Sequence, residues 1–337
     1  MLENLLNYDA QIAITLFLQS LGQWLTVPMQ FLSFLGNEEF YLLVMPALYW
    51  CFSPALGLRA ALLLMLSNSF NAAFKYLFAL PRPYWYSADV QAFSSETSFG
   101  LPSGHSQNAA ALWGMFALRT RQKPLKIGLW LLVALIGISR IYLGVHFSTD
   151  VLFGWLLGAL LLWLTVRLEP VLLRFLAARK LEERLLTAFA ASLVMILIGV
   201  VGIAAAHNTP HAQSVLLLAA PHLTEGESPF NPETPFTVAG AFFGLAFGAL
   251  VLQARQIELD ARGNARALIF RYLLGVIGIL LLWRGLGAFL PDDGTLLALG
   301  LRYIRYTLIG AWISAGAPLL FLRLGWMNQN PSPSPLP

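Results

Sequence analysis

Charged residues are scarce in this chain. Only 11% of its 337 residues are Asp, Glu, Lys or Arg, whereas 58% are hydrophobic. Soluble domains carry about 25% charged residues, so the composition excludes an ordinary soluble protein and predicts an integral membrane protein. The formal net charge is only +4, and the basic residues are scattered among short loops. We therefore expect no nucleic-acid partner and interpret these residues as charges that orient the chain in a bilayer.

Cysteine is almost absent as well. Cys51 is the only one, which excludes an intrachain disulfide and a metal site built from cysteines. The first residues, Met-Leu-Glu-Asn-Leu-Leu, lack the basic stretch that begins a secretory signal peptide. We expect insertion to rely on internal helices, without cleavage.

Long apolar segments, in contrast, are abundant. A helix needs about 20 mostly apolar residues to cross a bilayer. We therefore predict an all-α fold, a polytopic transmembrane helical bundle of about nine spans preceded by N-terminal amphipathic helices. The expected spans lie near residues 38–52, 55–79, 105–119, 126–143, 148–168, 185–206, 234–253, 267–290 and 298–323.

Composition divides the chain into four regions. Residues 1–37 mix apolar and polar positions and predict an amphipathic or interfacial region of one or two helices. Residues 38–170 form the expected core, because they hold three polar motifs. Residues 180–325 predict an accessory transmembrane bundle with no catalytic pattern, which would shape lateral access for a lipid or a homodimer surface. The Pro- and Ser-rich residues 328–337 predict a disordered tail.

The third motif, Ser139-Arg140-x5-His146-x3-Asp150, places a histidine and a carboxylate four residues apart. If a helix begins near His146, the two side chains share a face. The carboxylate can then accept a hydrogen from one imidazole nitrogen and leave the other lone pair free for nucleophilic attack. The alternative is that Asp150 only supplies a helix N-terminal charge and His146 is a buried bystander.

The second motif, Pro102-Ser103-Gly104-His105, directly precedes an apolar helical segment. Ser103 suits the cap position, and Gly104 allows close approach of the backbone. A helix N-terminus offers free N–H groups to a phosphate, and His105 beside it could protonate a leaving oxygen. Taken alone, this motif is better explained as a capping turn that happens to contain a histidine.

Three cations accompany these histidines. Lys75 and Arg82 belong to the first motif, Lys75-x6-Arg82-Pro83, and Arg140 belongs to the third. All three would stabilise the charge that spreads over a phosphoryl group during transfer. Pro81 and Pro83 flank Arg82 and end its helix. The alternative for the cations, and for Lys75 above all, is that their charged ends extend to the membrane interface. Ionisable groups inside membrane segments nevertheless indicate function by default.

The distribution of Lys and Arg predicts which side the motifs face. Threading the spans in order gathers most basic residues on one side, whereas loops 84–101 and 207–233 on the other side contain none. Because basic loops stay in the cytoplasm, the side with all three motifs is expected to be extracytoplasmic. Arg302 and Arg305 do not fit this pattern.

Together, Lys75-x6-Arg82-Pro83, Pro102-Ser103-Gly104-His105 and the third motif resemble the three signature motifs of the type 2 phosphatidic acid phosphatase superfamily. That superfamily includes vanadium haloperoxidases and glucose-6-phosphatases. The match covers roughly residues 38–168. Phe34-Leu-Gly-Asn-Glu-Glu-Phe-Tyr41 and the spans after residue 180 loosely resemble the long-chain-base (sphingosine) phosphate phosphatase branch.

The resemblance implies a helical bundle with a metal-independent site and no cofactor. By the same resemblance His146 is the nucleophile that forms a phosphohistidine, Asp150 orients it, and His105 is the general acid. The residues that would bind the phosphate are Lys75, Arg82, Ser103, Gly104 and Arg140.

We therefore predict a membrane phosphatase that hydrolyses a lipid phosphate monoester or diphosphate. Isoprenyl diphosphates, phosphatidic acid, phosphatidylglycerol phosphate and sphingoid-base phosphates are all compatible substrates. The short loops favour a bacterial inner membrane with the site facing the periplasm. Two alternatives stay open: a lipid phosphotransferase that uses the same intermediate, and a transporter or scaffold with a vestigial site.

Two loops outside the motifs carry aromatic residues and histidines. Loop 84–101 holds five aromatic residues, which predict either an interfacial belt or a lid that admits a lipid headgroup. Loop 207–233 holds His207, His211 and His222. Their irregular spacing and the lack of a partner carboxylate argue against a metal site there.

Overall fold

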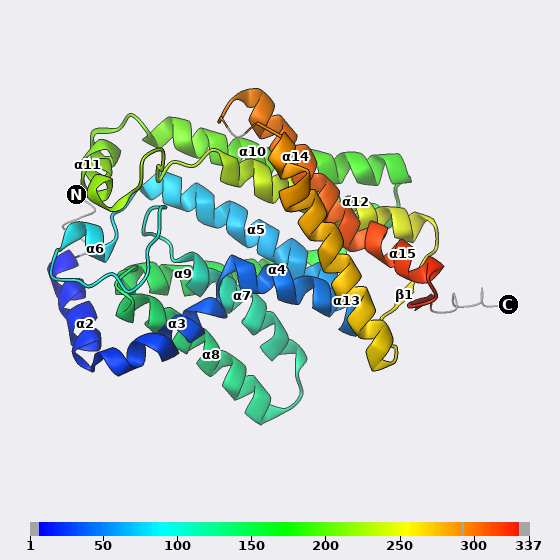
Figure 1. Cartoon of the computed structure of the whole chain (residues 1–337), viewed down its shortest axis with the longest axis horizontal. Coiled ribbons are helices and arrows are strands. Elements are labelled where there is room, and N and C mark those ends of the chain that lie inside the picture. The colour runs from blue at the N-terminus through cyan, green and yellow to red at the C-terminus, as the bar shows by residue number, and fades with distance from the viewer. Residues whose placement is uncertain (1–6, 292, 330–337) are drawn as a thin grey trace. The chain divides into compact units, whose positions relative to one another are not determined.

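The chain folds into a succession of helices joined by short connections (Figure 1). The computed structural model describes residues 7–291 and 293–329, and only the backbone of residues 38 and 39. The first half contains α2 (Tyr8–Ser20), η1 (Gln23–Leu25), α3 (Thr26–Phe34), α4 (Glu38–Ala47), η2 (Leu48–Phe52), α5 (Pro54–Phe78), α6 (Pro83–Tyr86), α7 (Gly104–Arg119), α8 (Lys123–Tyr142) and α9 (Ser148–Ala177).

The second half begins with the long helix α10. Its elements are α10 (Leu181–Ala206), α11 (Pro210–Ala219), η3 (Ala220–His222), α12 (Glu233–Ala254), β1 (Leu259–Asp260), α13 (Ala265–Leu280), η4 (Leu281–Gly285), η5 (Gly287–Phe289), α14 (Leu296–Ala311), η6 (Trp312–Gly316), α15 (Ala317–Arg323) and β2 (Asn328–Gln329). The two strands pair antiparallel, with Leu259 opposite Gln329. Of the predicted tail 328–337, the first two residues thus form β2, and residues 330–337 lie outside the described residues.

Six helices among the described residues are long and apolar enough to cross a membrane, or seven if the bent pair α2–α3 counts as one span. The chain is thus a mostly helical integral membrane protein, but nine spans are not found. The expected segments that fall short are 38–52, 55–79 and 105–119. The first yields a short helix, Phe40–Phe52. α7 has 16 residues, about 24 Å at 1.5 Å per residue, which is less than the hydrocarbon thickness.

α5 is long enough, with 25 residues, but one side of its second half is polar. That side binds α7. Asn71 Nδ2 donates to Gln107 Oε1 at 2.9 Å, and Gln107 Nε2 donates to the Ser67 carbonyl at 2.7 Å. Asn108 Nδ2 donates to Asn68 Oδ1 at 2.8 Å. Because each polar side chain finds a partner on the other helix, this polar surface is buried without an unpaired group.

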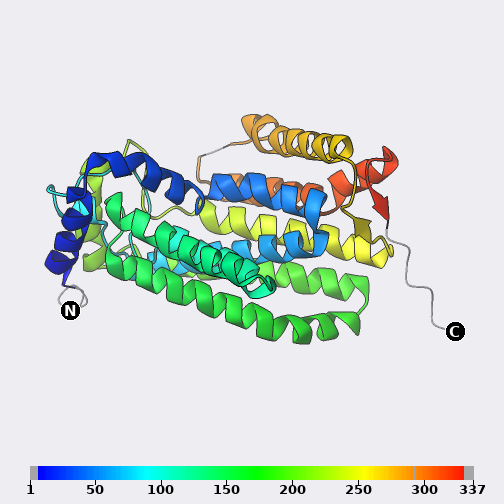
Figure 2. The ribbon, with the colours of Figure 1, turned by 90° about the horizontal axis from the view of Figure 1, so that it is seen from below.

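The N-terminal helices α2 and α3 meet at 88°, a bend that is plain in Figure 2. Residues 10–37 contain no charged residue. Their exposed side chains include large apolar ones, such as Phe17, Trp24 and Val27, beside a few uncharged polar ones. An uncharged apolar face that includes a tryptophan is typical of helices at a membrane interface.

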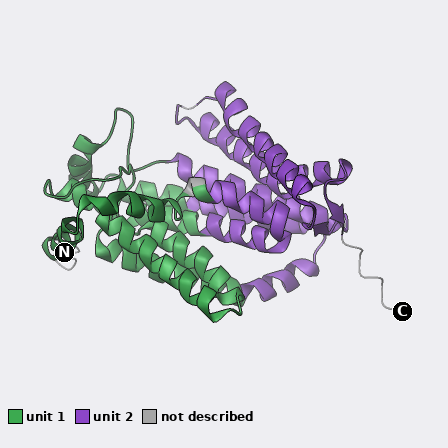
Figure 3. Cartoon of the chain, turned by 60° about the horizontal axis from the view of Figure 1, so that its bottom comes forward, with its two compact units in different colours: residues 1–40, 67–167, 198–231 green, residues 41–66, 168–197, 232–337 purple. Residues whose placement is uncertain are grey.

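The described chain divides into two compact units that do not follow sequence order (Figure 3). Unit 1 comprises residues 1–40, 67–167 and 198–231, and unit 2 comprises residues 41–66, 168–197 and 232–337. All three sequence motifs belong to unit 1. Residues 38–170 as a functional core and 180–325 as an accessory bundle therefore stay a prediction about function, distinct from this spatial division.

Unit 2 is held together by a buried arginine as well as by apolar contacts. Arg271 of α13 is 1% exposed. Its guanidinium donates to the carbonyl oxygens of Trp50, Ala261, Arg262 and Trp326, at 2.7–3.2 Å. Since four carbonyl oxygens accept from one cation, these bonds offset the cost of burying its charge and tie η2, the segment after β1 and the segment before β2 to α13.

Within unit 1, α9 packs against α7 through two glycines. A Cβ on Gly154 would lie 2.6 Å from the Ser103 carbonyl oxygen, and one on Gly158 would lie 2.3 Å from the Gln107 carbonyl oxygen. Both distances are too short for a real side chain, and the obstacle is backbone. The glycines thus set how closely the helix that follows His146 approaches the helix that begins beside Ser103.

We expect Gly158→Ala to destabilise the protein by about 1–3 kcal/mol, because the added methyl forces α9 and α7 apart. Thermal unfolding in detergent measures the loss. Gly128→Ala on α8 is the matched control, since nothing lies within 4 Å of its Cβ position and alanine favours a helix interior by about 0.5–1 kcal/mol. Equal stability of the two variants would contradict the close packing of α7 and α9.

Candidate active site

The first motif places Lys75 in the last turn of α5 and Arg82 in the connection to α6. Ala79 ends α5 with a φ of +45°. Lys75 Nζ donates to Ser98 Oγ and to the Phe99 carbonyl, both at 2.8 Å. Both cations are buried. The backbone of the loop between α6 and α7 therefore meets this motif directly.

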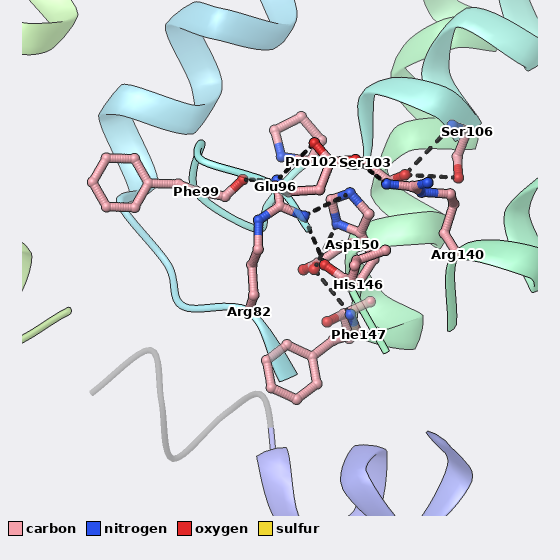
Figure 4. Close-up of polar contacts among 12 residues, drawn as sticks. Arg82, Glu96, Phe99, Pro102, Ser103, Ser106, Arg140, His146, Phe147 and Asp150 are labelled. Carbon is pink, nitrogen blue, oxygen red and sulfur yellow. Dashed lines mark hydrogen bonds and ion pairs between the residues drawn. The ribbon is translucent and has the colours of Figure 1, made fainter. Parts of the chain in front are cut away.

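Arg82 is fully buried, and its whole fork is occupied. Nε donates to the Ser98 carbonyl at 2.6 Å, and Nη2 donates to the Phe99 carbonyl at 3.2 Å. Nη1 donates to the Val145 carbonyl at 2.7 Å and lies 3.2 Å from His146 Nε2. Arg82 thus joins the first motif to the third through one rigid group (Figure 4).

In the second motif, Ser103 caps α7 as expected. Its Oγ accepts from the Ser106 backbone N–H at 3.4 Å and from Ser106 Oγ at 3.0 Å. The Ser103 N–H donates to the Asp150 carbonyl at 3.0 Å, which joins this turn to the third motif. A Cβ on Gly104 would lie 3.3 Å from Asn71 Oδ1. Among the described residues, no acceptor is recorded for the backbone N–H of Gly104 or His105, so both stay available to an anion.

The third motif ends α8 with Arg140 in its last turn and starts α9 with Asp150 in its first. His146 lies in the connection between them. The His146 Nδ1 atom lies 3.2 Å from Asp150 Oδ2, which also accepts the Phe147 N–H at 3.0 Å. Both the imidazole and the carboxylate are buried. The carboxylate therefore fixes the ring from one side, while Arg82 faces it from the other.

These two neighbours decide the tautomer of His146. A guanidinium can only donate, so Nε2 beside Arg82 must carry the lone pair; an ionised carboxylate can only accept, so Nδ1 carries the hydrogen. Burial lowers the pKa of His146 well below its ordinary value, and the positive charges of Arg82 and Lys75 lower it further. The ring is therefore neutral at physiological pH, with Nε2 as its basic atom.

His105 lies in the first turn of α7 and is partly exposed. It is close enough to His146 for the charge of one to affect the pKa of the other. A Cβ on Gly36 would lie 3.3 Å from the His105 Cβ and Cδ2 atoms, so the segment after α3 borders this histidine. The structure thus brings all eight predicted site residues into unit 1, around one end of α7, α8 and α9.

Glu96, in the loop between α6 and α7, is a further residue of the site that none of the three motifs contains. Its Oε1 accepts a hydrogen bond from Arg140 Nη2, and its Oε2 lies 3.8 Å from Arg82 Nη2. Burial alone would raise the pKa of this carboxyl, but the guanidinium groups of Arg140 and Arg82 outweigh burial and hold the pKa below its ordinary value. Glu96 is therefore an ionised group within the site.

Two residues of the N-terminal helices also contact the motifs. Ser33 Oγ of α3 accepts from Arg140 Nη1. Gln11 Oε1 of α2 accepts from the Thr149 N–H at 3.0 Å and from the Ser148 hydroxyl at 3.0 Å. Gln11 thereby caps the first turn of α9, the turn that carries Asp150. The predicted interfacial region is thus also a support of the site.

The three histidines of the second loop are separate from one another. His222 contacts the Tyr84 ring, His207 contacts the Phe230 ring, and the His211 ring lies 3.3 Å from the Phe78 carbonyl. Within residues 7–291 and 293–329, no group of three or more His, Cys, Asp or Glu side chains is placed to hold a metal ion. Instead, this loop packs through Phe230 on the ring of Phe99, at 4.8 Å between ring centroids, and the Phe99 carbonyl accepts from Lys75 and Arg82.

Comparison with known proteins finds two family profiles along the chain. The PAP2 superfamily profile matches residues 56–174, which contain all three motifs, and the profile of the PAP2 superfamily phosphatase transmembrane extension matches residues 236–329. The second match therefore identifies the spans within residues 236–329, which carry no catalytic pattern, as similar to this transmembrane extension.

Individual relatives agree with the profiles. Phosphatidylglycerophosphatase B of Bacillus subtilis is 41% identical over 26% of this chain and 47% of its own length. Human sphingosine-1-phosphate phosphatase 2 is 33% identical over 40% of this chain and 36% of its own length. The chain thus spans about half or less of these relatives.

Among solved structures, the crystal structure of a transmembrane PAP2-type phosphatidylglycerolphosphate phosphatase from Bacillus subtilis is 31% identical. It covers 48% of this chain and 85% of its own, with a TM-score of 0.42. The two profiles, the complete motifs and the relatives agree, and the chain belongs to the PAP2 superfamily.

Proposed function

We propose that this protein is an integral-membrane phosphatase that hydrolyses a lipid phosphate monoester or diphosphate through a phosphohistidine. The observation that supports this most strongly is the state of His146. Its Nδ1 faces Asp150 and its Nε2 faces Arg82, so a neutral, oriented nucleophile lies beside a cluster of cations. Relatives are named as phosphatidylglycerophosphatase and sphingosine-1-phosphate phosphatase, but also as glucose-6-phosphatase, so the choice of a lipid phosphate depends on the membrane setting of the site.

The proposed reaction has two steps. First, the lone pair on His146 Nε2 attacks phosphorus, and the bond from phosphorus to the lipid oxygen breaks as His105 gives that oxygen a proton. Second, water attacks the phosphohistidine, His105 takes a proton from the water, and inorganic phosphate leaves. Asp150 keeps the hydrogen on Nδ1 and stabilises the positive charge that develops on the ring. Lys75, Arg82, Arg140 and the available N–H groups of Gly104 and His105 hold the phosphoryl oxygens, and Ser103 supports them as the cap of α7.

We propose further that the site faces away from the cytoplasm, in a bacterial inner membrane. α8 carries Arg140 at one end and the basic residues Lys123 and Lys126 at the other. Its 20 residues span about 30 Å, close to the hydrocarbon thickness. Since basic residues favour the cytoplasmic side, the end with the motifs belongs outside. In this arrangement α5 and α7, joined by their polar faces, cross the bilayer or much of it as a pair.

His146→Ala is expected to lower phosphate release from lipid phosphates by at least about 10³-fold, because no other group replaces the nucleophile. His105→Ala should lose about 10²–10⁴-fold, the usual contribution of a general acid. Phosphate release by purified protein across a panel of lipid monoesters and diphosphates, with a chelator present, measures both losses.

His207→Ala, at an exposed histidine outside the motifs, is the matched control and should keep its activity. A short reaction with labelled substrate should trap acid-labile phosphate on the wild-type chain and none on His146→Ala. Undiminished hydrolysis by His146→Ala would refute the mechanism. Recovery of the phosphate on a second lipid instead of in solution would indicate a phosphotransferase.

Because Cys51 is the only cysteine, single-cysteine labelling can test the orientation. In a Cys51→Ala background, Ala88→Cys lies in the loop of the motif side and Gln122→Cys in the turn between α7 and α8; both positions are exposed. A membrane-impermeant maleimide should label Ala88→Cys in intact cells and Gln122→Cys only after the membrane is opened. The reverse pattern would place the site in the cytoplasm.

A further inference from the structure

Glu96 accepts a hydrogen bond from Arg140 and lies beside Arg82, the two arginines that a phosphate would need. It belongs to a loop rather than to a motif, yet its carboxylate lies between the guanidinium groups of the first and third motifs (Figure 4). The two arginines are 0% and 2% exposed, whereas the Glu96 side chain is 26% exposed. The carboxylate thus contacts both arginines, and its side chain is more exposed than either of theirs.

The backbone of Glu96 is fixed while its side chain is not enclosed. Tyr84 Oη donates to the Glu96 carbonyl at 2.9 Å and accepts from the Glu96 N–H at 3.2 Å. The following residues, Ser98 and Phe99, accept from Lys75 and Arg82. Rotation about the side-chain bonds of Glu96 would therefore free Arg140 Nη2 and remove the negative charge beside Arg82 without moving this part of the loop.

Arg140 retains unused capacity even with Glu96 in place. Its Nη1 donates to Ser33 and its Nη2 to Glu96, but its buried Nε has no hydrogen-bond partner within the part of the chain that the structure describes. A buried donor without an acceptor is costly. A tetrahedral anion that brings three or four oxygens can satisfy more of these donors than one carboxylate can.

We propose that Glu96 is an internal counter-anion that any phosphate must displace from Arg82 and Arg140 before it binds. This inference rests on the proposed function for its substrate, but concerns what neutralises the arginines before a substrate binds. Displacing Glu96 costs the same free energy for every ligand, so it weakens the binding of all anions by one common factor.

That common factor has two consequences for a phosphatase in a membrane. Most bilayer phospholipids are singly charged phosphodiesters, present at high concentration next to the site. Their phosphate group carries the same charge as Glu96 and has two free oxygens, so replacing Glu96 with it adds little attraction to the cations. A doubly charged monoester is attracted to the cations more strongly. After hydrolysis, the return of Glu96 to the arginines competes with inorganic phosphate and promotes its release.

The test compares anion binding by wild-type protein and Glu96→Gln, which keeps the shape and removes the charge. We expect Glu96→Gln to bind inorganic phosphate and dimethyl phosphate each at least tenfold more tightly, as measured by calorimetry in detergent. Hydrolysis by the variant should become sensitive to phosphodiester lipids that do not inhibit wild-type protein. Asp89→Asn is the matched control, because it removes an exposed acid from the same loop away from the arginines.

Unchanged or weaker phosphate binding in Glu96→Gln would overturn the proposal and leave Glu96 as a residue that only positions the arginines. If the variant is unstable, phosphate should raise its unfolding temperature more than it raises that of wild-type protein, because it replaces the missing anion. Glu96→Asp, which is shorter by one methylene, should lie between the two. The proposal is wrong if phosphate does not restore the unfolding temperature of Glu96→Gln and if Glu96→Asp binds phosphate no more tightly than wild-type protein.

The binding measurements need no turnover. Tighter phosphate binding in Glu96→Gln with no hydrolysis by the wild-type protein would retain the counter-anion and refute the proposed function. Hydrolysis by the wild-type protein, with no tighter phosphate binding in Glu96→Gln, would retain the proposed function and refute the counter-anion.

Discussion

The burial of positive charge in an apolar protein constrains the rest of this site. Arg82 and Arg140 are removed from water, and such groups are costly unless their donors find acceptors. The chain supplies these acceptors from scattered places: loop carbonyls at Ser98 and Phe99, the Val145 carbonyl, the Ser33 hydroxyl and the Glu96 carboxylate. The fold around the motifs can be understood as the arrangement that lets these groups reach two guanidinium ions.

The same constraint orients His146, the proposed nucleophile. Because Arg82 can only donate, His146 Nε2 must carry the lone pair. The Asp150 carboxylate accepts from the other side of the ring, so the hydrogen is on Nδ1. Arg82 therefore sets the state of the imidazole in addition to the phosphate binding that we propose for it. Its rigid fork suits both better than a lysine would.

The sequence was informative where local spacing carries the chemistry. The pair His146 and Asp150 is four residues apart, and Ser103 caps a helix that starts at the next residue, so both could be derived without a structure. The excess of apolar residues likewise predicted the helical membrane protein. The count of spans was less predictable, since hydropathy does not show that the polar residues of α5 are paired with those of α7.

Partners far apart in the sequence were beyond such reasoning. Glu96 meets Arg140 across 44 residues, and Ser33 meets it across 107. A glutamate between two basic motifs was the one available signal, but loop 84–101 also contains Asp89, and spacing alone does not distinguish the two acids. Gln11 gave no signal, because an amide among apolar residues is equally typical of an amphipathic helix.

The contacts of Gln11 and Ser33 bear on where the catalytic unit begins. A fragment cut to the matched residues 56–174 would contain every signature motif, yet Thr149 would lose its cap and Arg140 would lose the Ser33 hydroxyl. A fragment that keeps both contacts has to start upstream of Gln11. A chimera that grafts the motifs onto another scaffold keeps them only if it brings the two bent helices along.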